Sequence, residues 1–516
     1  MAGKTKSIYP RTRKDMLRII KAAEKEGHLT ETLIEEFLGH AFAMPVLWDC
    51  RSWFYKLDRQ TIEAHPMLVC HLALLSALAG RLDEAKAYVD ILGETPVHFK
   101  VENLGDRDFY RMTTELVMPY VDDTMFLRIV YSLVKVGAVP VRSLVLSACR
   151  PSLLNGFRDF TRFGPYLSKY KDTISETVHK LYGSGGNGVY EIALAEWQYQ
   201  NNECFQALIL VTGTIPLMEQ EEDMRCLFVA LALQMRILLV NGQTKAAKPL
   251  AEKIRERIAK TGWEELTSSL DALECLAACY DGRMDEVVDW LEKTAPDENK
   301  DIYMMDMYAY LIKVRCYIQT GKYMAAHVLV KQLITLLIPG KRHMDLCECY
   351  MLSAIVYHKA KDEKHSLEEM KKALGLAKKY KYIRLLADEG NCIVQILKIY
   401  QKENGTDDFT EQVMQLAAEV GGHFPDYLKS PEDYYEHLTN MEQKVLCLMA
   451  HGLSNDEIAD RLGKKTGTVK FHSNNIFRKL EVQNRHQAVS RGREVGLLSS
   501  DYRGENIKVI KIALDR

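Results

Sequence analysis

Apolar residues recur every three or four positions along almost the whole chain, which is the spacing of one buried face of an α-helix. The alternation of apolar and polar residues that is typical of half-buried strands is almost absent. Only 30 glycines and 14 prolines occur among the 516 residues, so few breaks interrupt the helical pattern. The pattern therefore predicts an all-α protein.

A recurring turn divides this helical pattern into units. A turn residue is followed five positions later by a small residue, as in Gly80 with Ala85. The same pairing occurs at Gly242 with Ala247, Gly282 with Val287 and Gly321 with Ala326, and weaker copies occur at Asn202 with Ala207 and Lys361 with Ser366. From position 202 to position 361 the turns are 40, 40, 39 and 40 residues apart.

Such a unit is typical of a helical hairpin. The turn residue adopts the left-handed conformation that ends the first helix, and the small residue lets the second helix approach closely. One hairpin cannot bury its apolar face alone, so neighbouring hairpins must stack into a superhelix. We expect this array to span residues 61–422, after an N-terminal helical segment at 1–60. Between residues 90 and 195 no clean turn sets the register.

The glycine cluster Tyr182–Gly188 is interpreted as a connection between helices. A phosphate-binding loop would need a preceding strand and a following Gly-Lys-Ser/Thr, and neither pattern is present in the sequence around it.

Four shorter helices are predicted near the C-terminus, after a polar linker at 423–437. Capping boxes open the first two of them, at Thr439 with Glu442 and at Ser454 with Glu457. A third helix follows the turn Gly463–Lys465, with Thr466 as the expected cap, and a fourth ends near Gly496. A short helix, a tight turn and a longer helix form a helix-turn-helix. We place this domain at 438–498 and a C-terminal tail at 499–516.

The third of these helices has two chemically different faces. Val469, Ser473, Ile476 and Leu480 fall on one side, with His472 at its edge, and are expected to pack inward. The opposite side carries side chains suited to a major groove: Lys470 for guanine, Asn474 for adenine and Phe471 for a thymine methyl group. The residues expected to contact phosphates are Lys464, Lys465, Thr468, Arg478, Lys479 and Arg485.

The charge distribution favours a polyanionic partner for this domain alone. The whole chain has a formal charge of −2, but residues 438–498 contain ten Lys and Arg against six Asp and Glu. The tail adds a charge of +1, so the other 437 residues carry −7. A small basic domain thus follows an acidic body.

Residues 438–489 resemble the LuxR-type (GerE-like) helix-turn-helix, most specifically in the string Thr468-Val469-Lys470-x-His472. The other matching positions are Leu438, Thr439, Glu442, Val445, Leu446, Gly452, Leu453, Ser454, Ile458, Ala459, Leu462, Gly467, Ile476, Lys479, Leu480, Val482, Arg485 and Ala488. The resemblance implies base reading by Lys470, Phe471 and Asn474, and phosphate contacts by Thr468, Lys479 and Arg485. It also implies dimerisation through the last helix. The family usually has an apolar residue and a serine where Lys464 and Lys465 stand, so this turn departs from its pattern.

The segment Trp53–Ala85 is similar to the start of the sensor array in MalT-like bacterial regulators, which combine a tetratricopeptide-type superhelix with a C-terminal LuxR-type domain. The N-terminal ATP-hydrolysing domain of those regulators is expected to be lacking. The resemblance implies a regulator that binds double-stranded DNA, with a homodimer as one expected form, senses a small molecule, peptide or protein, and contacts RNA polymerase if it is an activator. The basic N-terminus is not followed by the apolar segment of a secretory signal, so we expect a cytoplasmic protein. The alternative is a repeat-based interaction scaffold without specific DNA readout.

The helix expected at Asp301–Gln319 is rich in tyrosine and methionine. Tyr303, Met307 and Tyr310 share one face of it and are candidates to line a ligand cleft, although such a stripe is also typical of a helix core.

The sequence shows no pattern of catalytic chemistry. The 12 cysteines are scattered through apolar helices without a Cys-x-x-Cys pair or zinc spacing, and they are interpreted as core thiols. No nucleophile–base pair or paired carboxylate motif is apparent. We therefore expect neither an enzyme nor a bound metal or cofactor. No apolar run is long enough for a membrane span, and no membrane partner is expected.

Overall fold

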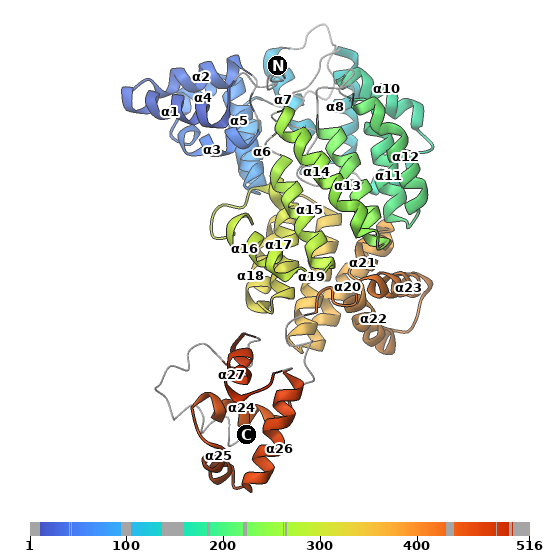
Figure 1. The fold of residues 1–516 in the computed structure, drawn as a ribbon. Helices are drawn as coiled ribbons and strands as arrows, with labels where there is room; N and C mark the ends of the chain where they lie inside the picture. The colour runs from blue at the N-terminus through green and yellow to red at the C-terminus, as the bar shows by residue number, and fades with distance from the viewer. Residues whose placement is uncertain are drawn as a thin grey trace, which may run out of the picture. The chain divides into compact units, whose positions relative to one another are not determined.

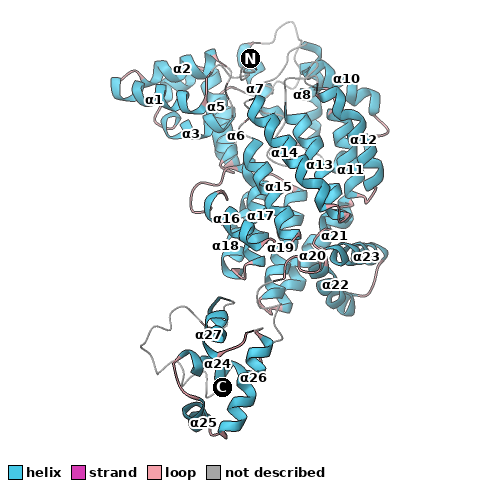
Figure 2. Cartoon of the chain, viewed as in Figure 1, coloured by secondary structure: helices cyan, strands magenta, loops and turns pink. Residues whose placement is uncertain are grey.

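The computed structural model describes residues 11–40, 42, 44–93, 105–136, 159, 161–182, 186–219, 224–261, 263, 266–429, 438–480, 482–494 and 498. The described residues form helices, turns and loops without a strand, which confirms the all-α prediction (Figure 2). The chain divides into two compact units: Met1–Cys316 with Met324–Tyr427, which we call the body, and Leu428–Arg516, to which the turn segment Tyr317–Tyr323 is also assigned.

The body begins with short helices that surround an aromatic core. They are α1 (Arg13–Glu26), α2 (Leu29–Gly39), α3 (Met44–Phe54) and α4 (Arg59–Ala64). Phe37 and Phe54 lie edge to face, with ring centroids 5.0 Å apart, and both are buried. His71 of the following helix packs against both rings.

Helical hairpins make up most of the rest of the body (Figure 1). The helices of the six hairpins that carry the recurring turn are α5 (Pro66–Leu78) with α6 (Leu82–Asp90), α11 (Val189–Gln200) with α12 (Cys204–Met218), α13 (Met224–Val240) with α14 (Thr244–Thr261), α15 (Thr267–Tyr280) with α16 (Met284–Lys293), α17 (Met307–Gln319) with α18 (Tyr323–Leu337), and α19 (His343–Lys359) with α20 (Glu363–Tyr380).

The remaining elements of the body are α7 (Asp106–Val117), α8 (Asp123–Val136), η3 (Thr161–Tyr166), α10 (Lys171–Tyr182), η6 (Met304–Asp306), α21 (Ile383–Ala387), α22 (Asn391–Asn404) and α23 (Asp408–His423). Residues 183–185 of the predicted glycine connection lie outside the described part of the chain.

The recurring turns have the conformation that the sequence predicts. All six turn residues have positive φ angles, between 64° and 75°, and they are Gly80, Asn202, Gly242, Gly282, Gly321 and Lys361. At the first turn the N–H of Arg81 donates to the Ser76 carbonyl at 2.8 Å, and the N–H of Gly80 donates to the Ala77 carbonyl at 3.0 Å. These two hydrogen bonds form a Schellman motif.

The small residue five positions after each turn is buried, also as predicted. These residues are Ala85, Ala207, Ala247, Val287, Ala326 and Ser366, each at most 2% exposed. Ser366 is the one polar residue of this set. Its hydroxyl donates to the Ala354 carbonyl of the other helix of the hairpin at 2.8 Å, so it has a hydrogen-bond partner although it is buried.

The C-terminal unit has four described helices and a core of its own. The helices are α24 (Asn440–Ala450), α25 (Asn455–Leu462), α26 (Thr466–Lys479) and α27 (Arg485–Glu494). Its buried residues come from all four helices and include Val445, Ile458, Ile476 and Ala488. The predicted helix-turn-helix order is therefore present in the structure.

Candidate nucleic-acid interface and effector cavity

Two capping boxes set the directions of the helices that lead to α26. The Thr439 N–H donates to the Glu442 carboxylate at 2.7 Å, and the Glu442 N–H donates to the Thr439 hydroxyl at 3.3 Å. Ser454 and Glu457 repeat the same pair of bonds with the same distances. Gly463 then ends α25 in the left-handed conformation, with φ of 62°. Both predicted boxes are confirmed, and they fix where α24 and α25 begin.

Helix α26 buries one face and exposes the other, as the sequence predicts. Val469, Ser473 and Ile476 are at most 3% exposed, and the Ser473 hydroxyl donates to the Val469 carbonyl at 2.8 Å. Lys470, Phe471 and Asn474 are all exposed, and Phe471 leaves 61% of its surface open. The exposed face of α26 therefore presents a cation, an aromatic ring and an amide to solvent.

Cations gather at the start of this exposed face. Lys464 and Lys465 are exposed in the turn before α26, and Thr468 is exposed in its first turn. The predicted cap at Thr466 is wrong, because Lys465 occupies the cap position and makes no side-chain cap hydrogen bond. The Thr466 hydroxyl donates instead to Asp456 at 2.7 Å, which ties the two helices of the motif together.

Lys479, a predicted phosphate ligand, is engaged inside the domain. Its ammonium group donates to Glu442 at 3.0 Å, and the two side chains are 12% and 4% exposed. Burial opposes ionisation of Glu442, but the Thr439 N–H and the Lys479 ammonium outweigh it and hold the pKa of the carboxyl below its usual value. Lys479 therefore has a structural role, because it compensates the charge of a buried carboxylate.

Arg485 is likewise engaged inside the domain. Its guanidinium donates to the Met449 carbonyl at 3.0 Å and also to the Leu453 carbonyl. Met449 lies in the last turn of α24, and Leu453 lies in the connection between α24 and α25, so Arg485 holds the end of one helix to the start of the next connection. Arg485 therefore also stabilises the fold, and its contact with phosphate stays a prediction, while Arg478 lies on the exposed face of α26.

The predicted ligand face of α17 is core. Tyr303 and Tyr310 are 8% and 2% exposed, and Met307 is completely buried. The Tyr303 ring packs against Trp48 of α3, with centroids 5.0 Å apart. These three residues therefore do not line a cleft, because N-terminal helices distant in sequence cover part of this side of the array.

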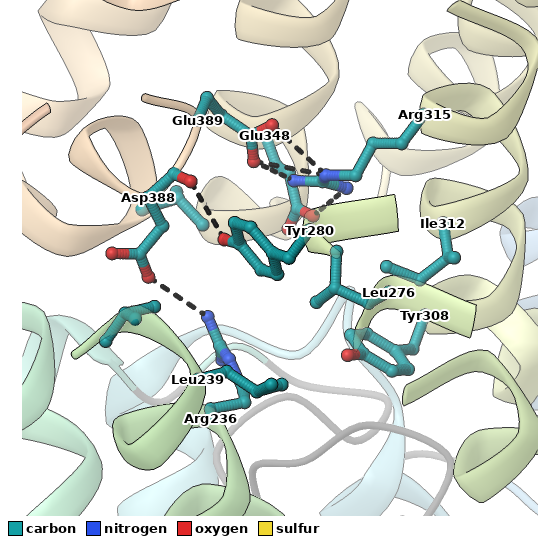
Figure 3. Close-up of a pocket in the computed structure, with 12 residues that line it drawn as sticks. Arg236, Leu239, Leu276, Tyr280, Tyr308, Ile312, Arg315, Glu348, Asp388 and Glu389 are labelled. Atoms are coloured by element: carbon teal, nitrogen blue, oxygen red, sulfur yellow. Dashed lines mark hydrogen bonds and ion pairs between the residues drawn. The ribbon is translucent and has the colours of Figure 1, made fainter. Parts of the chain in front are cut away.

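Another side of α17 lines a cavity within the body (Figure 3). Tyr308, Ile312 and Arg315 contribute to it, and the remaining lining residues are Arg236, Leu239, Val240, Leu276, Tyr280, Glu348, Leu385, Asp388 and Glu389. The free space is about 20 Å³, which is room for about one water molecule. In this conformation the cavity therefore has no room for a larger molecule.

Arg315 is the centre of a buried charge cluster beside this cavity. It pairs with Glu389 at 2.5 Å and with Glu348 at 2.9 Å, and all three side chains are at most 5% exposed. Tyr427 donates its hydroxyl to Glu389 at 3.0 Å. Burial raises the pKa of Glu389 above its ordinary value, although Arg315 acts in the opposite direction.

A second group of contacts holds Asp388. Arg384 pairs with its carboxylate at 2.7 Å, Tyr199 donates to the same carboxylate, and Tyr280 donates to its backbone carbonyl at 2.8 Å. Figure 3 shows the Tyr280 contact next to the Arg315 cluster. Sequence analysis missed this site because the partners lie far apart along the chain: Tyr199 and Asp388 are 189 positions apart. The signal that could have identified it is the presence of Arg236 and Arg315 within strongly apolar helices.

Among the described residues, no helix combines the length and the hydrophobicity that crossing a membrane would require.

Comparison with known proteins agrees with both units. The family model described as MalT-like TPR region matches residues 179–403, and the model described as bacterial regulatory proteins, luxR family, matches residues 436–491. The chain is 46% identical over 72 residues to the response regulator protein VraR of Staphylococcus saprophyticus, and 48% identical over 62 residues to that of Staphylococcus aureus. These segments cover 14% and 12% of this chain.

The chain spans about a third of the length of these relatives, 34% and 30% respectively. The relatives are named as response regulator proteins. The chain therefore joins a segment that matches the MalT-like TPR region to a C-terminal domain that matches the bacterial regulatory proteins of the luxR family.

Proposed function

We propose that this protein is a sequence-specific DNA-binding transcriptional regulator, that α26 reads bases in the major groove, and that the body senses an effector that controls this binding. The observation that carries the proposal is the exposed face of α26, where Lys470, Phe471 and Asn474 lie together beside two exposed lysines. Each side chain has a base-edge partner: an ammonium for guanine, an amide for adenine and a ring for the thymine methyl group. Lys464, Lys465, Thr468 and Arg478 are the proposed phosphate contacts.

Capture of sheared genomic DNA on the purified full-length protein tests this readout. The wild-type protein is compared with Lys470→Ala and with Gln443→Ala, which changes an exposed amide on α24 instead. We expect the wild type and the control to enrich the same few fragments, and Lys470→Ala to lose that enrichment. Uniform recovery of DNA by all three proteins would contradict sequence-specific readout.

The scaffold alternative differs in its salt dependence. A DNA complex with several phosphate contacts is expected to lose on the order of 10³-fold in affinity between 50 and 200 mM salt. A contact dominated by apolar groups changes little over that range. A flat salt dependence of DNA binding would therefore favour the scaffold.

The cavity in the body supports the sensing part of the proposal. It is lined by paired charges, and Tyr427, at the end of the body, donates to one of those charges. An effector with a carboxylate group can replace Glu389 at Arg315, which would release the Tyr427 hydroxyl. Since residues 428–437 connect this position to the helix-turn-helix, the end of the body is suited to transmit such a change.

Tyr427→Phe isolates this contact because it keeps the ring and removes only the hydroxyl. We expect the variant to shift the DNA affinity of the full-length protein in the absence of any effector. Tyr400→Phe, in the partly exposed part of α22, serves as the matched control. Equal DNA affinity of Tyr427→Phe and wild type would count against control through this contact. If the DNA affinities differ, a library of carboxylates is screened for thermal stabilisation of the wild-type protein to identify the effector.

A further inference from the structure

Three cysteine thiols meet inside the body. Cys275 and Cys279 lie four residues apart on α15, and Cys316 lies on α17. The Cys316 sulfur is 3.4 Å from that of Cys275 and 3.7 Å from that of Cys279, and all three sulfurs lie within 4.8 Å of one another. They are 4%, 0% and 0% exposed. Within the described part of the chain this is the one group of His, Cys, Asp or Glu residues arranged to hold an ion.

Repeat stacking creates this group. Residues four apart share a helix face, so Cys275 and Cys279 point the same way. Cys316 lies 41 and 37 positions further along the chain, which is about one repeat period. The first helices of two successive hairpins therefore bring the thiols together, and no short cysteine motif marks the site in the sequence.

The number of sulfurs limits which ion would fit. A structural zinc site has four ligands, and this group provides three. The surroundings are dry, and an uncompensated charge there is costly. Three thiolates leave a net charge of −2 around a monovalent ion and −1 around a divalent ion, but none around a trivalent centre. Arg315, next to Cys316 in sequence, already pairs with Glu348 and Glu389, so it offsets a further negative charge only in part.

We propose that Cys275, Cys279 and Cys316 form a binding site for a trivalent, thiophilic centre of the arsenous acid type. The reaction balances without an oxidant: As(OH)₃ and three thiols give one As(S-Cys)₃ centre and three water molecules. Each As–O bond is replaced by an As–S bond, and each thiol proton leaves in water. Both the entering molecule and the product are neutral, which suits a buried site. This proposal is independent of base reading by α26.

Titration of the full-length protein with arsenite tests the site directly. The protein is kept reduced with a phosphine, because dithiol reductants would compete for arsenic. We expect one arsenic to bind per chain, with a mass increase of one arsenic less three hydrogens, and with the loss of three thiols that react with a thiol reagent after denaturation. Binding without loss of three thiols, or no binding at micromolar arsenite, would overturn the proposal.

Single substitutions connect the binding to these residues. Cys316→Ala is expected to abolish stoichiometric binding, and so is Cys275→Ala, which changes the most exposed member of the group and serves if Cys316→Ala does not fold. Cys392→Ala, at a buried cysteine on α22, is the matched control and should bind arsenic like the wild type. Circular dichroism establishes that each variant is folded. Unchanged binding by folded Cys275→Ala and Cys316→Ala would place the arsenic elsewhere.

Parallel titrations with Cu(I) and Zn(II) test the valence argument. Both ions should bind more weakly than arsenite in competition. Displacement of bound arsenic by stoichiometric Cu(I) or Zn(II) would overturn the assignment to a trivalent centre.

Discussion

At the scale of single residues, the cations of the helix-turn-helix fall into two groups. Lys464 and Lys465 are exposed beside the start of α26, whereas Lys479 and Arg485 donate to groups of their own domain. Sequence resemblance does not distinguish these two groups. It shows that a basic residue stands at a position, but it does not show which group the side chain contacts. The distinction has different consequences for stability and for DNA binding.

Lys479→Ala should destabilise the helix-turn-helix. Glu442 would keep its buried position and lose its counter-charge, at a cost of about 1–3 kcal/mol. Thermal unfolding of residues 431–516, followed by circular dichroism, measures the effect. Lys464→Ala is the control and should leave the unfolding midpoint unchanged while it lowers the salt slope of DNA binding by about 1. If Lys479→Ala left the unfolding midpoint unchanged and lowered the salt slope of DNA binding, Lys479 would be a phosphate contact instead.

Asn474→Ala should relax the base preference at one position of the binding site. The loss of a paired amide is expected to cost about 1–3 kcal/mol on the preferred sequence and much less on sequences changed at that position. Binding titrations against a set of singly substituted operators measure this difference. An intact preference would show that Asn474 does not face the bases.

His71 should give the body an acid-sensitive stability. Burial among Phe37, Phe42 and Phe54 lowers the pKa of its imidazole from 6.5 to about 4. The unfolded chain therefore binds the proton more tightly, so this contribution to stability is complete above pH 6.5 and is lost as the pH falls toward 4. The free energy of unfolding that His71 contributes above pH 6.5 and loses in acid is about 3 kcal/mol.

Denaturant unfolding at pH 7 and pH 4.5, followed by tryptophan fluorescence, tests the role of His71. All five tryptophans lie in the body, so the signal reports on that unit. His71→Leu should lose less stability on acidification than wild type, and His365→Gln, at an exposed histidine, should behave like wild type. Identical acid sensitivity of His71→Leu and wild type would refute the assignment.

At the scale of elements, the hairpin turn is the repeated unit of the body. Gly80 and Gly282 have nearly the same φ angle, 75° and 68°, but different surroundings. A Cβ atom at Gly80 would lie 2.8 Å from the Leu336 side chain of α18, whereas at Gly282 no atom lies within 4 Å. Lys361 occupies the equivalent position of its hairpin as a non-glycine residue with φ of 64°.

Substitutions at these turns should separate backbone strain from packing. Gly282→Ala should cost about 1–2 kcal/mol, the cost of the left-handed conformation alone. Gly80→Ala should cost about 1 kcal/mol more, because Leu336 must move. Lys361→Gly should gain about 0.5–1 kcal/mol, since glycine removes the strain. Denaturant unfolding of the body provides all three values, and an equal cost at the two glycines would show that the Leu336 contact is unimportant.

At the scale of the whole molecule, the most consequential feature of the body is charge buried between distant segments. Arg315 holds Glu389 across 74 positions of sequence, and Tyr427 at the end of the body joins the same cluster. The cluster therefore ties the last helices of the body to its middle. Since one cation serves two carboxylates, its removal should have a large effect.

Arg315→Met should destabilise the body by about 3–5 kcal/mol, because two carboxylates would stay buried without a counter-charge. Tryptophan fluorescence in denaturant measures the loss. Combining the change with Glu348→Gln and Glu389→Gln should restore part of the stability, since no uncompensated charge would then be left. A single substitution without effect would show that water reaches these carboxylates.

The sequence by itself determined the helical class, the repeat and the helix-turn-helix, because these depend on interactions between near neighbours. A left-handed turn residue, a small residue five positions later and a capping box each act within a few positions, as at Gly80, Ala85 and Thr439. The outward face of α26 follows from the same helical period.

Only the tertiary structure decided which side chains from distant parts of the sequence meet. It showed that Tyr303 belongs to the core rather than to a cleft, that Lys479 neutralises Glu442, and that Arg315 gathers two carboxylates. It also brought three cysteines from successive repeats into contact. The physical reason is that stacking of hairpins places residues side by side according to the path of the superhelix, and the partners carry no mark of each other in the local sequence.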